Sequence, residues 1–307
     1  MSTAGFPCNL WVLIALLLAG FTPQASGAAI TALNPSSPQS LYLYGSATLD
    51  VGAGSVQVNS TNDAGLTIQG SLITLIAGTV NLSGSGYQTV GAPTISVDIS
   101  VLQPSVPDPL AFLPAPPVSS PVGPDKITGS GTFQPGYYPQ GLELVAGNNI
   151  TLAPGVYVLD NGFEISGNAV LHAGGVMFYL RSGAVQDNGT GGTFLAPPTE
   201  GIYGGITFFQ ARDNTNVALF NGTGPLQGLD GAAGIGTLYF PAATVDLGGT
   251  GDMYFNGIIA DKVHVHGDGL RKVIVPEPSG IGLLVLASAG LMKRVRGTRL
   301  TRRQPWH

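Results

Sequence analysis

Between residues 28 and 275 the chain consists of short apolar runs, and almost every run stops at Gly, Asn, Ser or Asp. Examples are LYLY at Leu41–Tyr44 and VMFYL at Val176–Leu180, with turns such as SGN at 166–168 and AGG at 173–175. Runs of this length between turn-forming residues are typical of β-strands, and no window in this region has the 3.6-residue period of a helix. We therefore expect an all-β protein.

The pattern predicts many strands. They are Leu41–Tyr44, Ala47–Val51, Ser55–Val58, Leu66–Gln69, Val80–Leu82, Val156–Leu159, Phe163–Ile165, Ala169–His172, Val176–Leu180, Ile206–Phe209, Thr237–Phe240, Met253–Ile259 and Lys262–His266. Turns of one to four residues allow successive coils to stack at strand spacing, and Ser-Gly or Gly-Ser turns recur at 45–46, 54–55, 70–71, 84–85 and 166–167. Both features favour a parallel β-solenoid, which the crossover rule makes a right-handed β-helix. A β-sandwich is the alternative.

The composition excludes some classes of function. Only 9% of residues are charged, and residues 28–275 hold 16 Asp and Glu against six Lys and Arg, a net charge of about −10. This acidic balance argues against nucleic acid as a partner, because nucleic-acid binding depends on Lys and Arg that neutralise phosphates. The single cysteine, Cys8, lies before this region, so we expect no disulfide and no thiol chemistry in it.

A proline-rich segment interrupts the strand pattern. Residues 104–124 contain eight prolines in 21 positions, and a chain this rich in proline favours extended polyproline conformation. The segment divides the region into a first β-rich part, residues 28–103, and a second, residues 125–275. It is either a linker or, since Leu110, Phe112 and Leu113 are apolar, an extended segment that packs along the outside of the solenoid. The apolar residues slightly favour packing.

The C-terminal 33 residues differ from the rest of the chain. A Pro-Glu-Pro motif is followed by 13 apolar residues, 280–292, and then by a basic tail. A helix of that length covers only about 20 Å of a bilayer core of about 30 Å, and the positive-inside rule would hold Lys293, Arg294 and Arg296 on the cytoplasmic side as a membrane stop. The order of motif, short transmembrane helix and basic tail resembles the bacterial PEP-CTERM sorting signal, residues 276–307, with Val275, Pro276, Glu277, Pro278 and Ser279 at the motif. The resemblance implies recognition and cleavage by an exosortase. A weak tail anchor or a membrane-associated helix is the alternative.

The N-terminus predicts export. Residues 10–20 form an apolar core of 11 residues, and the small residues 25–29 that follow suit cleavage by signal peptidase. We expect residues 1–27 to be a signal peptide. Together the two ends predict transient attachment to the inner membrane, followed by release to the cell surface or the extracellular matrix.

The region between the two signals is similar to the extracytoplasmic β-rich region of Tad pilus-assembly proteins of the TadG kind. The matching stretches are 34–36, 40–46, 56–60, 108–116, 152–158, 165–169, 176–180, 205–210, 236–242 and 258–261. The resemblance implies a β-solenoid-like domain outside the inner membrane and provides no catalytic residues. TadG-like proteins usually begin with a membrane helix and a small pilin-like segment, whereas we expect a cleavable signal and a PEP-CTERM tail in this chain.

Candidate chemistry is sparse. His264, His266 and Asp268 would share one face of a strand and are weak candidates for a metal site, but a solvent-facing strand with Val263 and Val265 turned inward explains the same pattern. Solenoid enzymes use paired carboxylates on polysaccharides. The candidates are Asp160 and Glu164, which flank a turn, and Asp187, Glu200 and Asp213 further along the chain. No cofactor motif is present.

The sequence thus predicts an exported, exosortase-processed protein that is not an enzyme and has a structural or adhesive role, with extracellular polysaccharide as a possible partner besides signal peptidase and exosortase. The aromatic residues of Leu41–Tyr44 and Thr237–Phe240 either contact sugars or belong to the core. The first alternative is a polysaccharide-active or polysaccharide-binding β-helix, with activity as a glycosidase or lyase, and the second is a pilus-associated protein.

Overall fold

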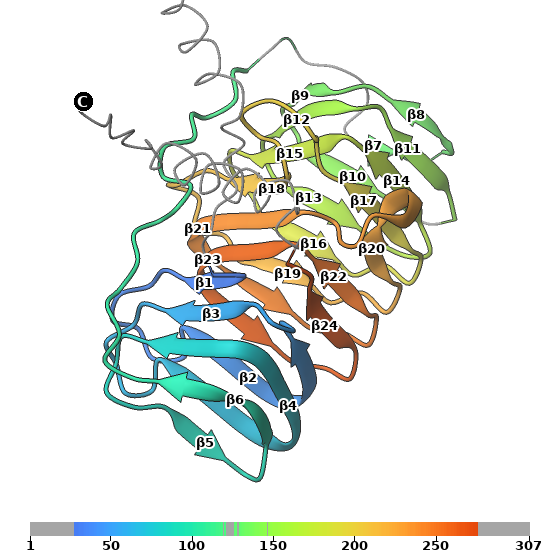
Figure 1. Ribbon diagram of the computed structural model, residues 1–307. Coiled ribbons are helices and arrows are strands. Elements are labelled where there is room, and N and C mark those ends of the chain that lie inside the picture. Colours follow the sequence, from blue (N-terminus) through green and yellow to red (C-terminus); the bar gives the residue numbers. More distant parts are fainter. Residues whose placement is uncertain (1–27, 119, 121–125, 128, 146, 276–307) are drawn as a thin grey trace, which may run out of the picture. The chain divides into compact units, whose positions relative to one another are not determined.

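The computed structural model describes residues 28–118, 120, 126–127, 129–145 and 147–275, which form an all-β fold (Figure 1). The predicted signal peptide, Pro276–Ser279 of the sorting motif, and Lys293, Arg294 and Arg296 lie outside these residues. Apart from one 3-10 turn, η1 (Leu229–Gly231), the described residues are strands, turns and irregular backbone. No helix in this part of the chain has the length and hydropathy needed to cross a membrane.

The strands stack as a parallel β-solenoid, which confirms the prediction of an all-β protein with this architecture. Each described strand pair is parallel, and the pairings fall into three runs, one for each face of the coil. Five longer strands bend across the corners between faces. They are β2 (Leu41–Asp50), β4 (Leu66–Leu82), β6 (Thr94–Ser100), β21 (Thr237–Leu247) and β23 (Gly257–Val265).

The shorter strands belong to one face each. The first face contains β5 (Gln88–Val90), β7 (Lys126–Ile127), β10 (Leu142–Leu144), β13 (Phe163–Ile165), β16 (Val185–Asp187) and β19 (Ala218–Phe220). The second contains β8 (Gly131–Phe133), β11 (Asn149–Leu152), β14 (Val170–Gly174), β17 (Thr193–Ala196), β20 (Leu226–Gly228), β22 (Met253–Phe255) and β24 (Leu270–Val273). The third contains β1 (Ile30–Ala32), β3 (Ser55–Val58), β9 (Gly136–Tyr138), β12 (Gly155–Leu159), β15 (Val176–Leu180) and β18 (Ile206–Gln210).

The coils do not stack in the order of the sequence. The stack begins with β7–β9 and continues along the chain to β24, and residues 30–100 then follow at the far end (Figure 1). One coil, which we call the junction coil, is composite: the end of β23 and all of β24 supply its first two faces, and β1 supplies the third. The two β-rich parts expected from the sequence are therefore halves of one continuous solenoid.

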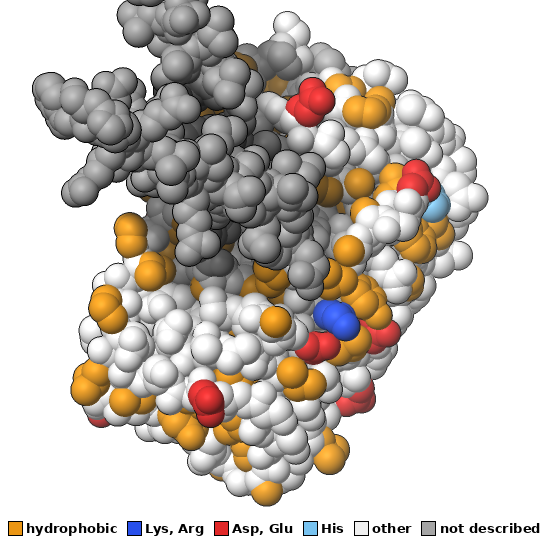
Figure 2. Space-filling view, viewed as in Figure 1, with side chains coloured by type: hydrophobic (Ala, Val, Ile, Leu, Met, Phe, Trp, Pro, Cys, Tyr) orange, Lys and Arg blue, Asp and Glu red, His pale blue; other side chains and the backbone are white. Residues whose placement is uncertain are grey.

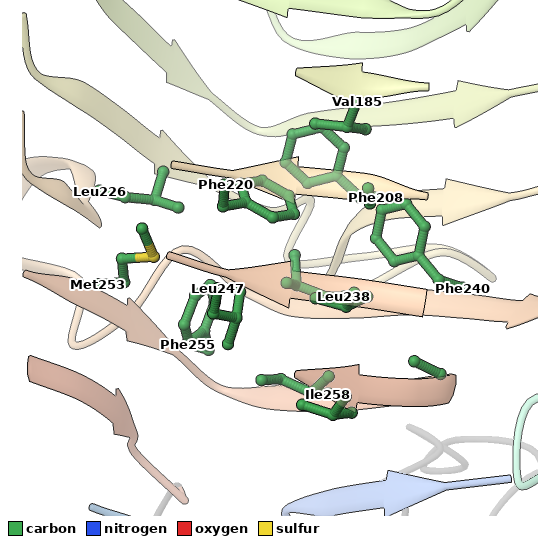
Figure 3. Packing of buried hydrophobic residues seen from close by; sticks show 14 of the residues in the cluster. Val185, Phe208, Phe220, Leu226, Leu238, Phe240, Leu247, Met253, Phe255 and Ile258 are labelled. Carbon is green, nitrogen blue, oxygen red and sulfur yellow. The ribbon is translucent and has the colours of Figure 1, made fainter. Parts of the chain in front are cut away.

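Inward side chains of all three faces fill a single apolar core. Phe208, Phe220 and Phe240 lie together inside the coils, each at most 1% exposed (Figure 3). Alternate residues of each strand point inward because side chains of a strand alternate between its two sides. Some corners between faces require glycine because successive coils lie very close there. Gly224 stacks on Gly191, and a Cβ on Gly224 would collide with the carbonyl oxygen of Gly191.

The outward side of the third face is also apolar. β15 and β18 are buried along their whole length, and outward residues such as Met177, Phe209 and Tyr239 form a second apolar cluster outside the coils. Strands that are buried on both sides have continuous apolar sequences, and VMFYL and ITFF are examples of such runs. Another part of the chain must cover this face.

The proline-rich segment covers it. Residues 103–118, which we call the strap, lie along the third face, and Leu110 and Leu113 are 6% and 2% exposed. The Arg212 guanidinium donates to the carbonyl oxygens of Leu110, Ala111 and Leu113 at 2.9, 3.0 and 3.1 Å. The strap is therefore an extended segment packed against the solenoid and not a free linker.

The strap runs against the stacking order. Its first residues contact Asn59 beside β3, where the Asn59 amide donates to the Val106 carbonyl at 2.7 Å. Further on, the Tyr239 hydroxyl donates to Asp108 at 2.6 Å, and the Tyr203 hydroxyl donates to the Pro114 carbonyl at 3.0 Å. Burial, and then the Asp108 carboxylate, raise the pKa of Tyr239. The strap thus returns the chain from the last coil of the stack toward the first.

Arg271 of β24 is a charged residue inside the solenoid. It is 0% exposed, and its guanidinium donates to the carbonyl oxygens of Leu247, Gly248, Gly249, Gly251 and His266. Burial lowers the pKa of Arg271 to about 10, so it remains charged at neutral pH. The planar fork thus holds together two stacked turns, the one after β21 and the one after β23, where the Leu247 carbonyl also accepts the His266 N–H at 2.9 Å.

Replacing Arg271 by Lys should lower the free energy of unfolding by about 2–4 kcal/mol, because one ammonium cannot reach five carbonyls spread around a guanidinium. Urea unfolding followed by circular dichroism measures the loss. Lys272→Ala is the matched control: Lys272 points outward on the same strand, 3.4 Å from Asp50, and should cost less than about 1 kcal/mol. Equal losses in the two variants would contradict a structural role for the Arg271 fork.

Candidate functional site

The outward side of the first face carries a ladder of polar and aromatic side chains. In-register pairing places the middle residue of each strand above that of the next, so equivalent side chains recur about every 4.8 Å along the stack. The sequence of partners, which we call the first-face ladder, is Glu143, Glu164, Gln186, Leu219, Asp246, His264 and Tyr42. All seven are half-buried or exposed.

An aromatic cluster lies at the junction-coil end of this ladder and consists of Tyr42, Tyr44, His264 and His266. The Tyr42 and Tyr44 rings stack with centroids 4.5 Å apart, and the Tyr44 and His266 rings stack at 4.6 Å. The His264 ring meets Tyr42 edge-on at 5.7 Å. Since the tyrosines come from β2 and the histidines from β23 and the residue after it, the cluster exists only because the two halves of the chain stack on one another.

Hydrogen bonds hold these rings in place. The Tyr42 hydroxyl donates to Gln69 Oε1 at 2.7 Å, and His266 Nε2 lies 2.7 Å from Asp246 Oδ1. His264 Nε2 lies 3.2 Å from the Gln39 carbonyl oxygen. Burial lowers the pKa of His264 despite the opposing effects of Asp246 and Gln39, and burial also raises the pKa of Tyr44. At neutral pH the cluster therefore presents uncharged rings at Tyr44 and His264 beside the Asp246 carboxylate.

The three weak metal candidates are held by different partners. Val263 and Val265 are buried and His264 points outward between them, as expected for a strand with one face in the core. Asp268, beyond the end of β23, accepts a hydrogen bond from Ser46. In the part of the chain that the structure describes, no group of three or more His, Cys, Asp or Glu side chains is arranged to hold a metal ion.

A cleft of about 580 Å³ lies at the corner that follows the third face, beside β12, β15 and β18. Asp160 lines the cleft; it accepts a hydrogen bond from the Tyr137 hydroxyl at 2.6 Å and pairs with Arg181 at 3.1 Å. The hydrogen bond to Asp160 raises the pKa of Tyr137. Asp213 also lines the cleft. This polar lining, with both signs of charge, suits a hydroxyl-rich ligand better than an apolar one.

A smaller hollow of about 130 Å³ lies next to the cleft, and Gln140 and Asn161 line both. It is bordered by Glu143, Glu164 and Gln186 of the first-face ladder. The cleft, the hollow and the ladder therefore adjoin one another on one side of the solenoid.

The five carboxylates expected from the sequence have different environments. Asp213 lines the cleft, and Glu200 is exposed on the turn before β18. Asp160 lies in the cleft, and Glu164 lies at the hollow directly above Glu143. Asp187 points into the solenoid and is 7% exposed, with its carboxylate accepting the Gly189 N–H at 3.1 Å. Sequence reasoning did not identify Glu143 as the partner of Glu164, because no local signal reveals which residues stack.

Comparison with known proteins adds no relative. No family model matches the chain, and no curated protein and no solved structure is similar to it.

Asp187 should make stability depend on pH. Burial raises its pKa in the folded protein to about 6, against a value of 3.8 when solvated, so raising the pH from 4 to 6 should destabilise the fold. The difference corresponds to about 3 kcal/mol at most. Asp187→Asn keeps the acceptor for Gly189 and should remove this loss.

Urea midpoints at pH 4, 5, 6 and 7 for the two proteins measure the effect. The difference in urea midpoint between Asp187→Asn and the parent should increase up to about pH 6 and then stay constant. If the urea midpoints of the two proteins changed with pH in parallel, burial would not raise the pKa of Asp187 and the prediction would be wrong.

Proposed function

We propose that the protein is an exported, exosortase-processed component of the cell surface or extracellular matrix, that it is not an enzyme, and that it adheres to neutral polysaccharide. The observation that carries the proposal is the aromatic cluster of Tyr42, Tyr44, His264 and His266. Its rings are partly exposed on a face that no other described segment covers, unlike Tyr239, whose face the strap covers.

The chemistry of the cluster suits sugars. A pyranose ring has apolar C–H faces and polar hydroxyl edges, and tyrosine and histidine offer an apolar ring face with a polar atom at its rim. Gln69 and Asp246 lie beside the rings and provide amide and carboxylate groups for hydroxyls. A linear polymer lying along the first-face ladder would pass the apolar Leu219 and then meet polar side chains at Gln186, Glu164 and Glu143.

The charge of the region favours a neutral polymer. Residues 28–275 carry a net charge of about −10, and the ladder itself includes three acidic side chains, Glu143, Glu164 and Asp246. Figure 2 shows one face of the molecule, on which charged side chains are few and scattered among uncharged polar and apolar ones. An acidic polysaccharide would be repelled over the whole surface.

The solenoid is compatible with both processing events. β1 begins at Ile30, shortly after the expected end of the signal peptide, and β24 ends at Val273, just before the sorting motif that starts at Val275. Removal of residues 1–27 and of the sorting signal would therefore leave each described strand intact.

The mass of the protein recovered from the exterior of its bacterial host tests the processing. We expect a species that lacks residues 1–27 and the residues C-terminal to the Pro-Glu-Pro motif, because both ends are read as cleaved signals. Pro276→Ala with Pro278→Ala should leave the C-terminal segment attached. Recovery of the uncut chain from the cytosol would contradict the proposal.

A specific observation favours a second candidate function, hydrolysis or lysis of polysaccharide. Glu143 and Glu164 stand in register beside a hollow, and Asp160 lies in the adjoining cleft. Paired carboxylates about 5–9.5 Å apart are the machinery of most glycosidases. The same groups also serve as hydroxyl acceptors in a binding groove, so the experiment must separate binding from turnover.

Binding of a soluble neutral β-glucan, measured by affinity electrophoresis, should fall about tenfold or more in Tyr42→Ala and in Tyr44→Ala, because each variant removes a stacking ring. Tyr254→Ala is the control, since Tyr254 points outward on the second face, away from the cluster. A polymer of uronic acids should bind weakly to all four proteins.

When the same proteins are incubated with the β-glucan, no new reducing ends should be formed. Turnover by the parent protein that disappears in Glu164→Gln or Asp160→Asn would establish the enzymatic candidate instead. Full binding by both tyrosine variants would show that the aromatic cluster is not the adhesive site.

A further inference from the structure

The last coil of the stack has an open edge. β5 and β6 pair only with β4 among the described residues, and β6 presents seven residues whose outer backbone groups have no strand partner there. An open edge of this length is a template for pairing with another strand. The residues of this coil, 87–103, carry a single charge, Asp98.

The core is also open at this coil. Leu75 and Val80 are 0% exposed, whereas Ile95 and Ile99, which stack on them from β6, remain only partly buried. Val97 is likewise partly buried, and Val90 of β5 is 57% exposed. Within the described part of the chain, no further coil covers these apolar side chains, as the next coil does for the inner ones.

The edge strand is nearly self-complementary. β6 reads TISVDIS, so an antiparallel pairing with its own copy about Val97 places Val97 opposite Val97 and Ile95 opposite Ile99. Thr94 then faces Ser100, and Ser96 faces Asp98. Inward apolar residues meet apolar residues, and the two Asp98 side chains do not face each other, which removes the like-charge repulsion that opposes edge pairing.

The bend of β6 fits the same symmetry. Thr94–Ser96 pair on the second face and Asp98–Ser100 on the third, with a register shift at the corner between them. A two-fold axis through the Val97 corner exchanges these two faces and passes through the middle of the first face. There β5, which reads QTV, would pair with its own copy about Thr89.

We propose that two copies of the chain pair end to end through this coil, with β6 antiparallel to β6 and β5 antiparallel to β5. The contact is isologous, so it closes at two copies. It continues the three-faced core from one solenoid into the other and covers Ile95, Val97 and Ile99. This interface is independent of polysaccharide binding, because the aromatic cluster lies on inner coils.

Sedimentation equilibrium of the full chain in mild detergent tests the proposal. The parent should sediment as a dimer, and Val97→Lys should shift it to monomer, because two lysines would face each other at the axis. Leu72→Lys is the matched control: Leu72 is 76% exposed near the same end but off the axis, and this variant should remain dimeric. A monomeric parent, or open-ended oligomers, would overturn the proposal.

A cross-link tests the register. In a Cys8→Ser background, Val97→Cys should form a disulfide-linked dimer on mild oxidation, because directly opposed residues of antiparallel strands bring their Cβ atoms within about 4.5–5.5 Å. Leu72→Cys in the same background should not. A dimer that sediments normally but cross-links through residue 72 and not through residue 97 would overturn the two-fold arrangement.

Discussion

The parallel pairing of β1 with β23, and of β2 with β23 and β24, is the interaction on which the rest of the structure depends. Ile30 stacks on Ile258 and Leu41 on Val263, so residues more than 200 positions apart in the sequence become neighbours. Without this pairing the junction coil would lack its third face, and each half would end in an open apolar core. Contacts of such long range are formed late and slowly, because a long loop must close before they contribute.

The strap follows from the same topology. Since the N-terminal half stacks beyond the C-terminal half, the chain must return along the whole stack between residues 103 and 126, and an extended proline-rich segment spans a long distance with few residues. Side chains of the third face hold the strap through its backbone carbonyls: Tyr203 donates to Pro114, and Arg212 donates to the non-proline residues between Pro109 and Pro114. The third face could then become apolar on both sides, whereas the first face is a polar and aromatic surface that no other described segment covers.

Local features of the fold were predictable from the sequence, and stacking was not. The strand runs Ser55–Val58 and Val176–Leu180 agree with β3 and β15, because alternation and turn residues are local signals. Register is different. Leu219 lies 33 residues after its partner Gln186, whereas Val263 lies 18 after Val245, so no fixed repeat reveals which side chains share a ladder. The sequence pattern singled out the two histidines of the aromatic cluster. That Tyr42 is their neighbour could not be predicted, because it follows from the stacking at the junction coil.

The two proposals reinforce each other through symmetry. A two-fold axis that passes through the middle of the first face places the first-face ladders of both copies on the same side of the dimer. A long polymer that reaches one aromatic cluster could then meet the second on the same molecule, and the second contact would be intramolecular. Even weak stacking on Tyr42 and Tyr44 would give strong attachment in that arrangement, because a linked second site gains an effective concentration set by the spacing between sites. Rigidity matters here: a solenoid fixes that spacing, whereas a flexible linker would not.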